Sequence, residues 1–343
     1  MTLILAAVCG RYAFHASDRL TTTNVSRRFP SGEFDPHSNK TVIVCGPESW
    51  LAIGYTGIAF LDGRPTDQLI AEAVTGISDL SSGGIGSWFP HGLHYREIRD
   101  RIERAMAAAY AKLTPKERKM QTTVLAAGVQ RKGHGIKHVM FRVIVDDTGH
   151  AAFEILPNAF FRREFPGGPY RLPASYVARA GTCFTAIAQS SFSAITDYMQ
   201  TREATPEGFR DLLMDEVSAT GAVSDKVGRD VMGVIIDAAK QKVNVHYRLA
   251  EHTKHASILA RVHKRLGKDL VKNLHGNTDG VPSPYMLAPN GMRFGPSVGT
   301  GGWDCDGFDY NITGLPERER QPGELTGLFF SSQPRKDEYG RYR

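Results

Sequence analysis

The sequence of 343 residues has little cysteine and no long apolar run. Its 4 cysteines lie far apart and form no Cys-x-x-Cys pair, which argues against a zinc site or a disulfide framework. No apolar segment approaches the roughly 20 residues of a membrane-spanning helix. The apolar run Leu3–Cys9 has no basic residues before it and is soon followed by Arg11, so it does not fit a secretory signal peptide. These absences predict a cytoplasmic protein with no membrane partner.

The usual signatures of bound metals and nucleotides are also missing. The histidines show no His-Glu-x-x-His spacing, and the glycine-rich segment Ser81–His91 lacks the context of a phosphate-binding loop. We therefore expect neither a metal nor a cofactor. The net charge is +6, and much of the basic excess falls in Lys240–Lys272. Such a segment fits a solvated helix face, an oligomer contact or a nucleic-acid patch, and nucleic acid is the partner that we expect least.

Strand-like and helix-like segments alternate in blocks along the first 248 residues. Apolar and β-branched runs predict strands at Leu3–Cys9, Tyr12–Ser17, Lys40–Cys45, Trp50–Tyr55, Thr122–Val129, His138–Val145, Ala151–Leu156, Tyr176–Ile187, Asp230–Asp237 and Lys242–Arg248. Periodicity and start signals predict helices at Thr66–Ile77, Tyr95–Leu113, Ser190–Gln200 and Thr205–Thr220. This order predicts an α+β fold in which two antiparallel sheets lie face to face, flanked by helices on both outer sides: a four-layer αββα sandwich.

The chain changes character after Arg248. The segment His252–His275 is basic and predicted to be helical, and from Gly276 the chain is rich in glycine, proline and asparagine. We expect a main domain at residues 1–248 and a C-terminal extension at residues 249–343, the tail of which is partly disordered.

The second residue carries the chemistry from which a function can be inferred. If Met1 is removed, Thr2 becomes the N-terminus and holds a hydroxyl and a free α-amine on one residue. Such a pair is a self-contained nucleophile and base, because the amine can accept the hydroxyl proton while the oxygen attacks a carbonyl. The alternative is an ordinary second residue retained behind Met1.

The order of elements resembles the proteasome β-subunit fold of the N-terminal-nucleophile (Ntn) hydrolases, and it is similar to their bacterial two-component protease relative. The resemblance covers about Thr2–Arg248. Thr2 stands where the family has its catalytic threonine. Asp18, in the run His-Ala-Ser-Asp, looks like the acid at the end of the family's second strand, and Lys40 is similar to its buried lysine. The resemblance implies an Ntn-hydrolase sandwich that works without a cofactor.

Two further residues are implied by matches near these strands. Thr22 corresponds to a position that helps to hold the substrate backbone. Gly54, in the run Ala-Ile-Gly-Tyr-Thr-Gly, would supply the N–H of the oxyanion hole. The alternative for Gly54 is a packing or turn glycine.

The remaining two candidates come from later segments. Ser190, in the run Ala-Ile-Ala-Gln-Ser-Ser-Phe-Ser-Ala, would be the family's accessory serine, and Ser191 is a one-residue alternative. Asp225, in Ser-Asp-Lys-Val-Gly-Arg-Asp-Val, is the candidate second acid, and Gly228 stands where the family has a serine. Ser190 also fits a helix N-cap.

Together these residues would form an amide-hydrolysing site. A free α-amine has a pKa of about 7.7–8.0, and a neighbouring Lys40 ammonium would disfavour its charged form and keep it available as a base. Asp18 would offset the charge of the lysine. The N–H of Gly54 would stabilise the tetrahedral oxyanion, a contribution worth about 10²–10³ in rate. The reaction would proceed through an acyl-enzyme on Thr2.

The sequence therefore leads to a threonine-type peptidase or amidohydrolase that acts on peptide or amide substrates. The resemblance also implies a homo-oligomer and makes an AAA+ unfoldase a candidate partner. Two alternatives stay open. One is an Ntn amidase acting on a small amide, and the other is a catalytically inactive structural or interaction subunit of the same fold.

Overall fold

The structure is a computed structural model that describes residues 2–9, 11–22, 33–35, 40–46, 48–76, 93–132, 135–155, 176–181, 205–237, 242–248, 285–287, 309–314 and 328–333. The helices are α1 (Thr66–Thr75), α2 (Tyr95–Ala111) and α4 (Pro206–Val223), with a short 3-10 turn, η2 (Glu117–Lys119). The strands are β1 (Ile4–Cys9), β2 (Tyr12–Asp18), β3 (Thr21–Thr22), β4 (Glu33–Asp35), β5 (Thr41–Cys45), β6 (Ser49–Thr56), β7 (Phe60–Leu61), β8 (Arg64–Pro65), β9 (Thr122–Lys132), β10 (Gly135–Asp146), β11 (Gly149–Glu154), β12 (Tyr176–Ala180), β13 (Val231–Asp237), β14 (Lys242–Arg248), β15 (Tyr285–Leu287), β16 (Asp309–Gly314) and β17 (Leu328–Gln333).

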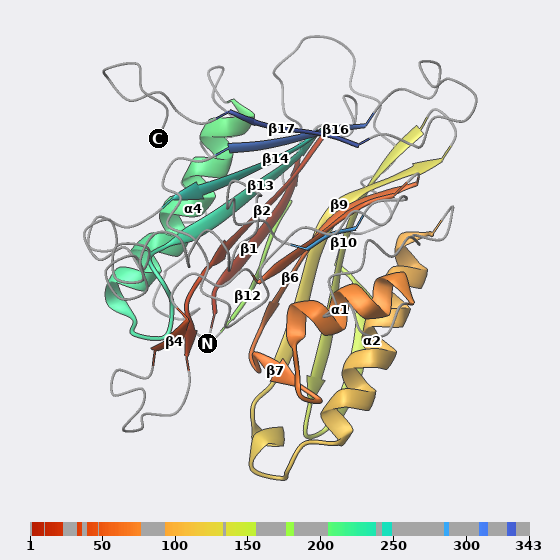
Figure 1. Cartoon of the computed structure of the whole chain (residues 1–343), viewed down its shortest axis with the longest axis vertical. Helices are drawn as coiled ribbons and strands as arrows, with labels where there is room; N and C mark the ends of the chain where they lie inside the picture. Colours follow the sequence, from red (N-terminus) through yellow and green to blue (C-terminus); the bar gives the residue numbers. More distant parts are fainter. Residues whose placement is uncertain are drawn as a thin grey trace, which may run out of the picture.

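Two large sheets form the body of the molecule (Figure 1). The seven-stranded sheet has the order β12-β1-β2-β13-β14-β16-β17 and its pairings are antiparallel. The six-stranded sheet has the order β11-β10-β9-β6-β5-β15. It is antiparallel except at β15, which runs parallel to β5. The expected α+β class with two antiparallel sheets is confirmed, and the parallel edge strand is an addition that the sequence pattern did not indicate.

The C-terminal segment contributes strands to both sheets. β15 joins the six-stranded sheet, and the β16–β17 pair joins the seven-stranded sheet beside β14. Parallel pairing needs a long crossover connection, and β15 meets this condition because it lies far from β5 in the sequence. Residues beyond 248 thus extend the same two sheets that the earlier strands form.

The sheets face each other across an apolar core. On β1, Ile4 and Ala6 point to the other sheet, while Leu5 and Ala7 point to α4. A strand buried on both faces needs apolar residues at nearly every position. The N-terminal run is therefore continuously apolar because it forms an inner strand, with β12 on one side and β2 on the other.

The helices lie on the outer faces of the sheets (Figure 1). α1 and α2 pack on the six-stranded sheet, and α4 packs on β2 and β13 of the seven-stranded sheet. On α4, Phe209, Leu213 and Val217 recur at intervals of four and so form one apolar stripe. The start predicted for this helix is confirmed, because the side chain of Thr205 caps it by accepting the N–H of Gly208.

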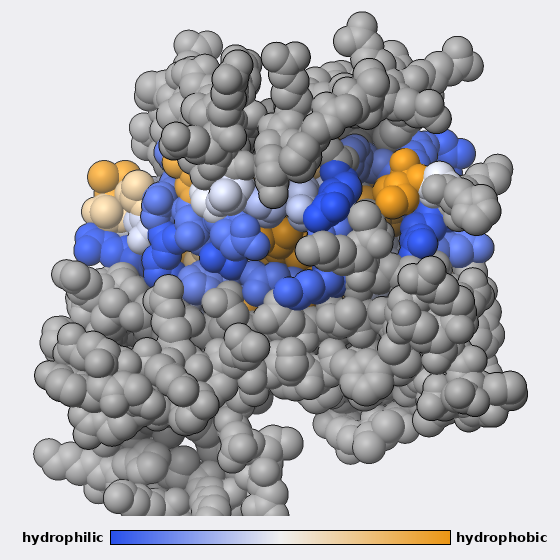
Figure 2. Space-filling model, turned by 90° about the horizontal axis from the view of Figure 1, so that it is seen from above, coloured by the Kyte–Doolittle hydropathy of each residue, from blue (hydrophilic) through white to orange (hydrophobic). Residues whose placement is uncertain are grey.

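Some expected elements differ or fall outside the described residues. The helix predicted at Thr66–Ile77 ends at Thr75, because Gly76 takes a left-handed conformation with φ of 75°. The predicted helices Ser190–Gln200 and His252–His275 lie outside the described residues. Among the helices that the structure describes, none has the length and apolar character to cross a membrane. On the face drawn in Figure 2 the described residues are mostly hydrophilic, with small separate apolar areas.

Candidate active site at Thr2

Thr2 lies directly before β1 and is 4% exposed. Its carbonyl accepts a hydrogen bond from Thr56 Oγ1 at 3.0 Å, and the next N–H along the chain, that of Leu3, donates to Asp18 Oδ1 at 3.0 Å. The backbone of Gly181, just after β12, also lies against the Thr2 carbonyl, since a Cβ on this glycine would be 2.0 Å from the carbonyl oxygen. The peptide unit after Thr2 is therefore fixed on three sides.

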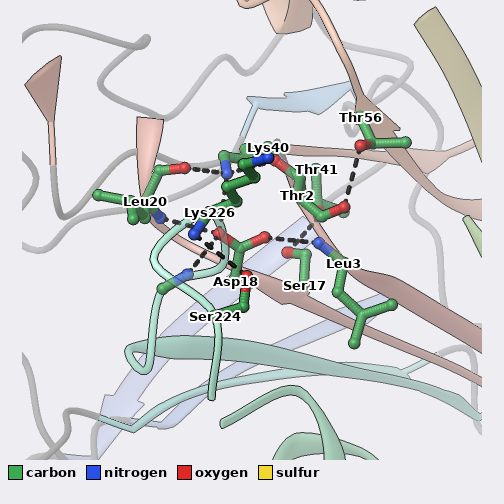
Figure 3. Close-up of polar contacts among 11 residues, drawn as sticks. Thr2, Leu3, Ser17, Asp18, Leu20, Lys40, Thr41, Thr56, Ser224 and Lys226 are labelled. Atoms are coloured by element: carbon green, nitrogen blue, oxygen red, sulfur yellow. Dashed lines mark hydrogen bonds and ion pairs between the residues drawn. The ribbon is translucent and has the colours of Figure 1, made fainter. Parts of the chain in front are cut away.

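Lys40 brings its ammonium group to the Thr2 hydroxyl (Figure 3). The Nζ atom donates to Thr2 Oγ1 at 2.5 Å, to Asp18 Oδ2 at 3.0 Å and to the carbonyl oxygen of Leu20. An ammonium group has three N–H donors, and these three acceptors match that number. The side chain is 3% exposed, so its charge is held by protein groups rather than by water.

Asp18 ends β2, and its carboxylate is completely buried. Oδ1 accepts the N–H of Leu3, and Oδ2 accepts Lys40 Nζ together with the N–H groups of Leu20 at 3.2 Å and Gly228 at 3.0 Å. Four donors from the described residues surround the group, so both of its oxygens act as hydrogen-bond acceptors. The sequence suggested that Thr2, Asp18 and Lys40 converge, and the structure brings these three residues together.

Gly228 is packed too tightly to carry a side chain. A Cβ at this position would lie 2.7 Å from Leu20 Cβ and 2.9 Å from the Leu20 backbone nitrogen. The close approach lets the Gly228 N–H reach Asp18, which explains why glycine stands where the resemblance implies a serine. Asp225, in the same connection between α4 and β13, is exposed and makes no contact with Thr2, Asp18 or Lys40 among the described contacts.

Gly54 lies inside β6 rather than at its end. Its registered partners are Thr41 on β5 and Leu125 on β9. Because the N–H of Tyr55 donates to the Lys40 carbonyl on the β5 side, the N–H of Gly54 must point the other way, to β9. The structure therefore does not bring the Gly54 N–H to Thr2. The strand ends at Thr56, whose contact with Thr2 the sequence reasoning missed.

Of the last two predicted site residues, the structure describes only Thr22, and its described backbone pairing is with β4 rather than with Thr2, Asp18 or Lys40. Thr22 is half-buried on β3, where it pairs with Glu33 of β4. Ser190 and its alternative Ser191 lie outside the described residues. Met1 does as well, whereas the nitrogen that would become the α-amine after its removal belongs to Thr2, which is described.

Other potentially reactive groups near these strands are inert. Burial raises the pKa of the Cys9 and Cys45 thiols to about 12, so neither is a nucleophile near neutral pH. Burial lowers the pKa of His15 to about 3, which keeps this imidazole neutral. No group of His, Cys, Asp and Glu side chains suited to a metal ion occurs within the described part of the chain.

Comparison with known proteins finds similarity among solved structures only. No family model matches the sequence, and no curated protein matches it. Among solved structures the chain is similar to Anbu (ancestral beta-subunit) from Yersinia bercovieri, with 14% sequence identity and a TM-score of 0.44. The match covers 79% of this chain and 96% of that chain. A similarity of this size does not assign the chain to a family.

Proposed function

We propose that the chain is an Ntn hydrolase of the proteasome β-subunit type, a threonine-type peptidase or amidohydrolase with Thr2 as its nucleophile after removal of Met1. The observation that carries the proposal is the contact between Lys40 Nζ and Thr2 Oγ1 at 2.5 Å. The same lysine is paired with buried Asp18. Because a buried ion pair often costs more desolvation free energy than its attraction returns, a pair placed on the N-terminal hydroxyl is better explained by chemistry than by stability.

Two amines, the side chain of Lys40 and the α-amine of a processed Thr2, would have different roles in the reaction. In its ammonium form Lys40 has three N–H donors and no lone pair with which to accept a proton, and three acceptors surround its Nζ. The base is therefore the α-amine of Thr2, and Lys40 stabilises the negative charge that develops on Oγ1. Asp18 holds Lys40 in place and, through Leu3, fixes the start of β1.

The reaction then follows in two balanced steps. Oγ1 of Thr2 attacks the amide carbon while its proton moves to the α-amine, and the resulting tetrahedral intermediate collapses. The C–N bond breaks, the leaving nitrogen takes the proton from the α-ammonium, and an ester remains on Oγ1. Water, deprotonated by the α-amine, attacks this ester. The bond between the acyl carbon and Oγ1 breaks, the α-ammonium returns the proton to Oγ1, and the carboxylic acid leaves.

The oxyanion donor is best sought at the end of β6. The N–H of Tyr55 points to the β5 side, and the same alternation continued past Thr56 would direct the N–H of Gly57 to the side on which Lys40 lies. Gly57 has φ of 111°, a backbone conformation that favours glycine, and it follows Thr56, which already touches Thr2. We assign the oxyanion role to Gly57 in place of Gly54.

The partners belong to the same proposal. A peptide substrate, a homo-oligomeric assembly, an AAA+ unfoldase and a location in the cytoplasm are what the resemblance implies for such an enzyme. The arrangement of two facing sheets with helices outside them supports the αββα sandwich on which these implications depend.

Two measurements test the function. Intact mass of the purified protein shows whether Met1 is removed, and a peptide epoxyketone, which reacts with an N-terminal threonine, should then add once and at Thr2. Thr2→Ala should keep its fold and take up no label. Retention of Met1 in every molecule, or a processed chain that takes up no label, would refute the proposed activity and favour an inactive subunit. Hydrolysis of peptide and small-amide panels then separates a peptidase from an amidase.

A further inference from the structure

His15 occupies an unusual place between the two sheets. It lies on β2, is 0% exposed, and points toward the six-stranded sheet, as its strand neighbour two residues earlier, Ala13, does. Its Nδ1 lies 3.5 Å from Thr41 Oγ1, and its Nε2 has no hydrogen-bond partner in the described structure. A buried polar ring with so few bonds is costly, so its presence calls for a reason other than hydrogen bonding.

The ring fits into the space that Gly54 leaves free. A Cβ on Gly54 would lie 2.4 Å from His15 Nε2, 2.6 Å from His15 Cε1 and 3.1 Å from Ile4 Cδ1. The edge of the imidazole therefore rests on the backbone of β6, where any other residue would push it away. Gly54, which the sequence predicted as the oxyanion-hole donor, therefore has a packing role against His15.

The same contact is linked to the reactive groups through Thr41 and Ser17. Gly54 is the registered partner of Thr41 on β5, and Thr41 follows Lys40 in the chain. A hydrogen bond of 3.2 Å joins Thr41 Oγ1 to Ser17 Oγ, the residue before Asp18. The link between Ser17 and Thr41 thus touches the imidazole through Thr41, and the next residue on each side, Asp18 and Lys40, forms a second link between the sheets.

We propose that His15 is a positioning residue for the Thr2 site: seated on Gly54, its ring sets the spacing between β2 and β5 at which Lys40 reaches both Thr2 and Asp18. The inference deepens the proposed function and rests on it for its catalytic consequence. The position of Lys40 relative to Thr2 and Asp18 can be tested without any activity. The weak contact to Thr41, at 3.5 Å, makes the shape of the ring more important than its nitrogen atoms.

A set of four variants tests the proposal in the full-length chain. His15→Ala empties the space, His15→Phe keeps a flat ring, Gly54→Ala places a methyl group against the ring, and the double variant His15→Ala/Gly54→Ala combines them. Gly233→Ala is the matched control, because its Cβ would lie 2.5 Å from Met214 Sδ on the opposite face of the same sheet. This control crowds the flexible side chain of Met214, which packs between α4 and the seven-stranded sheet rather than between the two sheets.

Crystal structures of the variants give the readout that needs no activity. In His15→Ala and Gly54→Ala we expect Lys40 Nζ to lose hydrogen-bond distance to Thr2 Oγ1 or Asp18 Oδ2, and in His15→Phe and Gly233→Ala we expect both contacts to stay. If Gly54→Ala does not fold, His15→Ala and His15→Phe decide the question by themselves. Lys40 keeping both contacts in His15→Ala would overturn the proposal.

The rate of epoxyketone addition to Thr2 gives the functional readout. A displacement of about 1 Å can cost about 10²-fold in rate, so His15→Ala should react about 100-fold more slowly, while His15→Phe should stay within about threefold of the unaltered protein. Gly54→Ala should add no further loss in the His15→Ala background, since residues in contact are not additive. Fully additive losses would overturn the proposal. An unaltered protein that takes up no label refutes the activity alone, and the crystal structures still decide the position of Lys40.

Discussion

Two lysine–aspartate pairs in this molecule have nearly the same geometry and opposite surroundings. Lys40 Nζ lies 3.0 Å from Asp18 Oδ2, and the two side chains are 3% and 0% exposed. Lys112 Nζ, at the end of α2, lies 2.8 Å from Asp62 Oδ2, with side chains that are 63% and 24% exposed. By distance alone the second pair would be the stronger, so distance is a poor guide to what either pair contributes.

The difference lies in what else can serve each charge. Water can replace either partner of the exposed pair, and surface ion pairs contribute little to stability. Lys112 and Arg64 do lower the pKa of Asp62 through their hydrogen bonds, but that carboxylate remains accessible to solvent. Around Lys40 and Asp18 every donor and acceptor is a protein group. The buried pair therefore cannot lose one partner without leaving an unpaired charge in the core.

Lys40→Met should have the largest effect on both the free energy of unfolding and the labelling of Thr2. Removing one partner of a buried pair typically costs about 3–5 kcal/mol of the free energy of unfolding, and the variant should also lose epoxyketone labelling of Thr2. Lys112→Met is the matched control and should change neither quantity measurably. Denaturant unfolding with intact-mass labelling checks both variants. Equal stability of the two variants would show that Asp18 is satisfied without Lys40.

The second prediction concerns His15, a buried neutral side chain, and the pH dependence of the free energy of unfolding. Burial lowers the pKa of His15 from 6.5 to about 3. Above pH 6.5 the ring is neutral in both states, and as the pH falls the unfolded chain binds a proton that the folded chain does not. The free energy of unfolding should therefore decrease from pH 6.5 downward, by about 2–3 kcal/mol at pH 4.5 from this residue. His15→Phe should remove this part of the pH dependence, and parallel curves for the two proteins would contradict the assignment.

The two regions also show how far the sequence could lead. The pairing of β1 and β2 could be predicted, because two apolar runs follow each other closely in the sequence. The observed register pairs Ile4 with Ser17, and Asp18 accepts the N–H of Leu3. Lys40 could be placed at the start of β5 from its β-branched run. These local patterns were enough to predict that Thr2, Asp18 and Lys40 lie close together, and the structure places the three residues in contact.

The rest depends on how one sheet lies on the other. Gly54 and Gly57 both belong to the same glycine-bearing segment, and only the observed end of β6 at Thr56 shows which of them lies beyond the strand. The fit of His15 on Gly54 joins residues on two sheets. No periodicity within either strand records that contact, since it depends on the offset between the stacked sheets.

Gly228→Ala tests the connection that covers Asp18. The new methyl group would lie 2.7 Å from Leu20 Cβ and 2.9 Å from its backbone nitrogen, so the chain must move and the N–H bond to Asp18 lengthens. Overpacking of this kind typically costs about 1–3 kcal/mol. Lys226→Ala, an exposed change in the same connection, is the control and should leave the unfolding midpoint unchanged. Equal midpoints for the two variants would mean that this connection shifts freely and does not hold Asp18.

Thr56→Val should have the smallest effect on stability and still be visible in the rate. It removes the bond from Thr56 Oγ1 to the Thr2 carbonyl while it keeps nearly the same shape, so the free energy of unfolding should fall by about 1 kcal/mol. Thr75→Val removes a similar bond, from Thr75 Oγ1 to the Ala71 carbonyl at 2.8 Å on α1, and serves as the control. If the Thr2 peptide must be held for attack, only Thr56→Val should also slow epoxyketone addition, by about tenfold. Equal labelling rates for the two variants would show that Asp18 and Gly181 hold this peptide without Thr56.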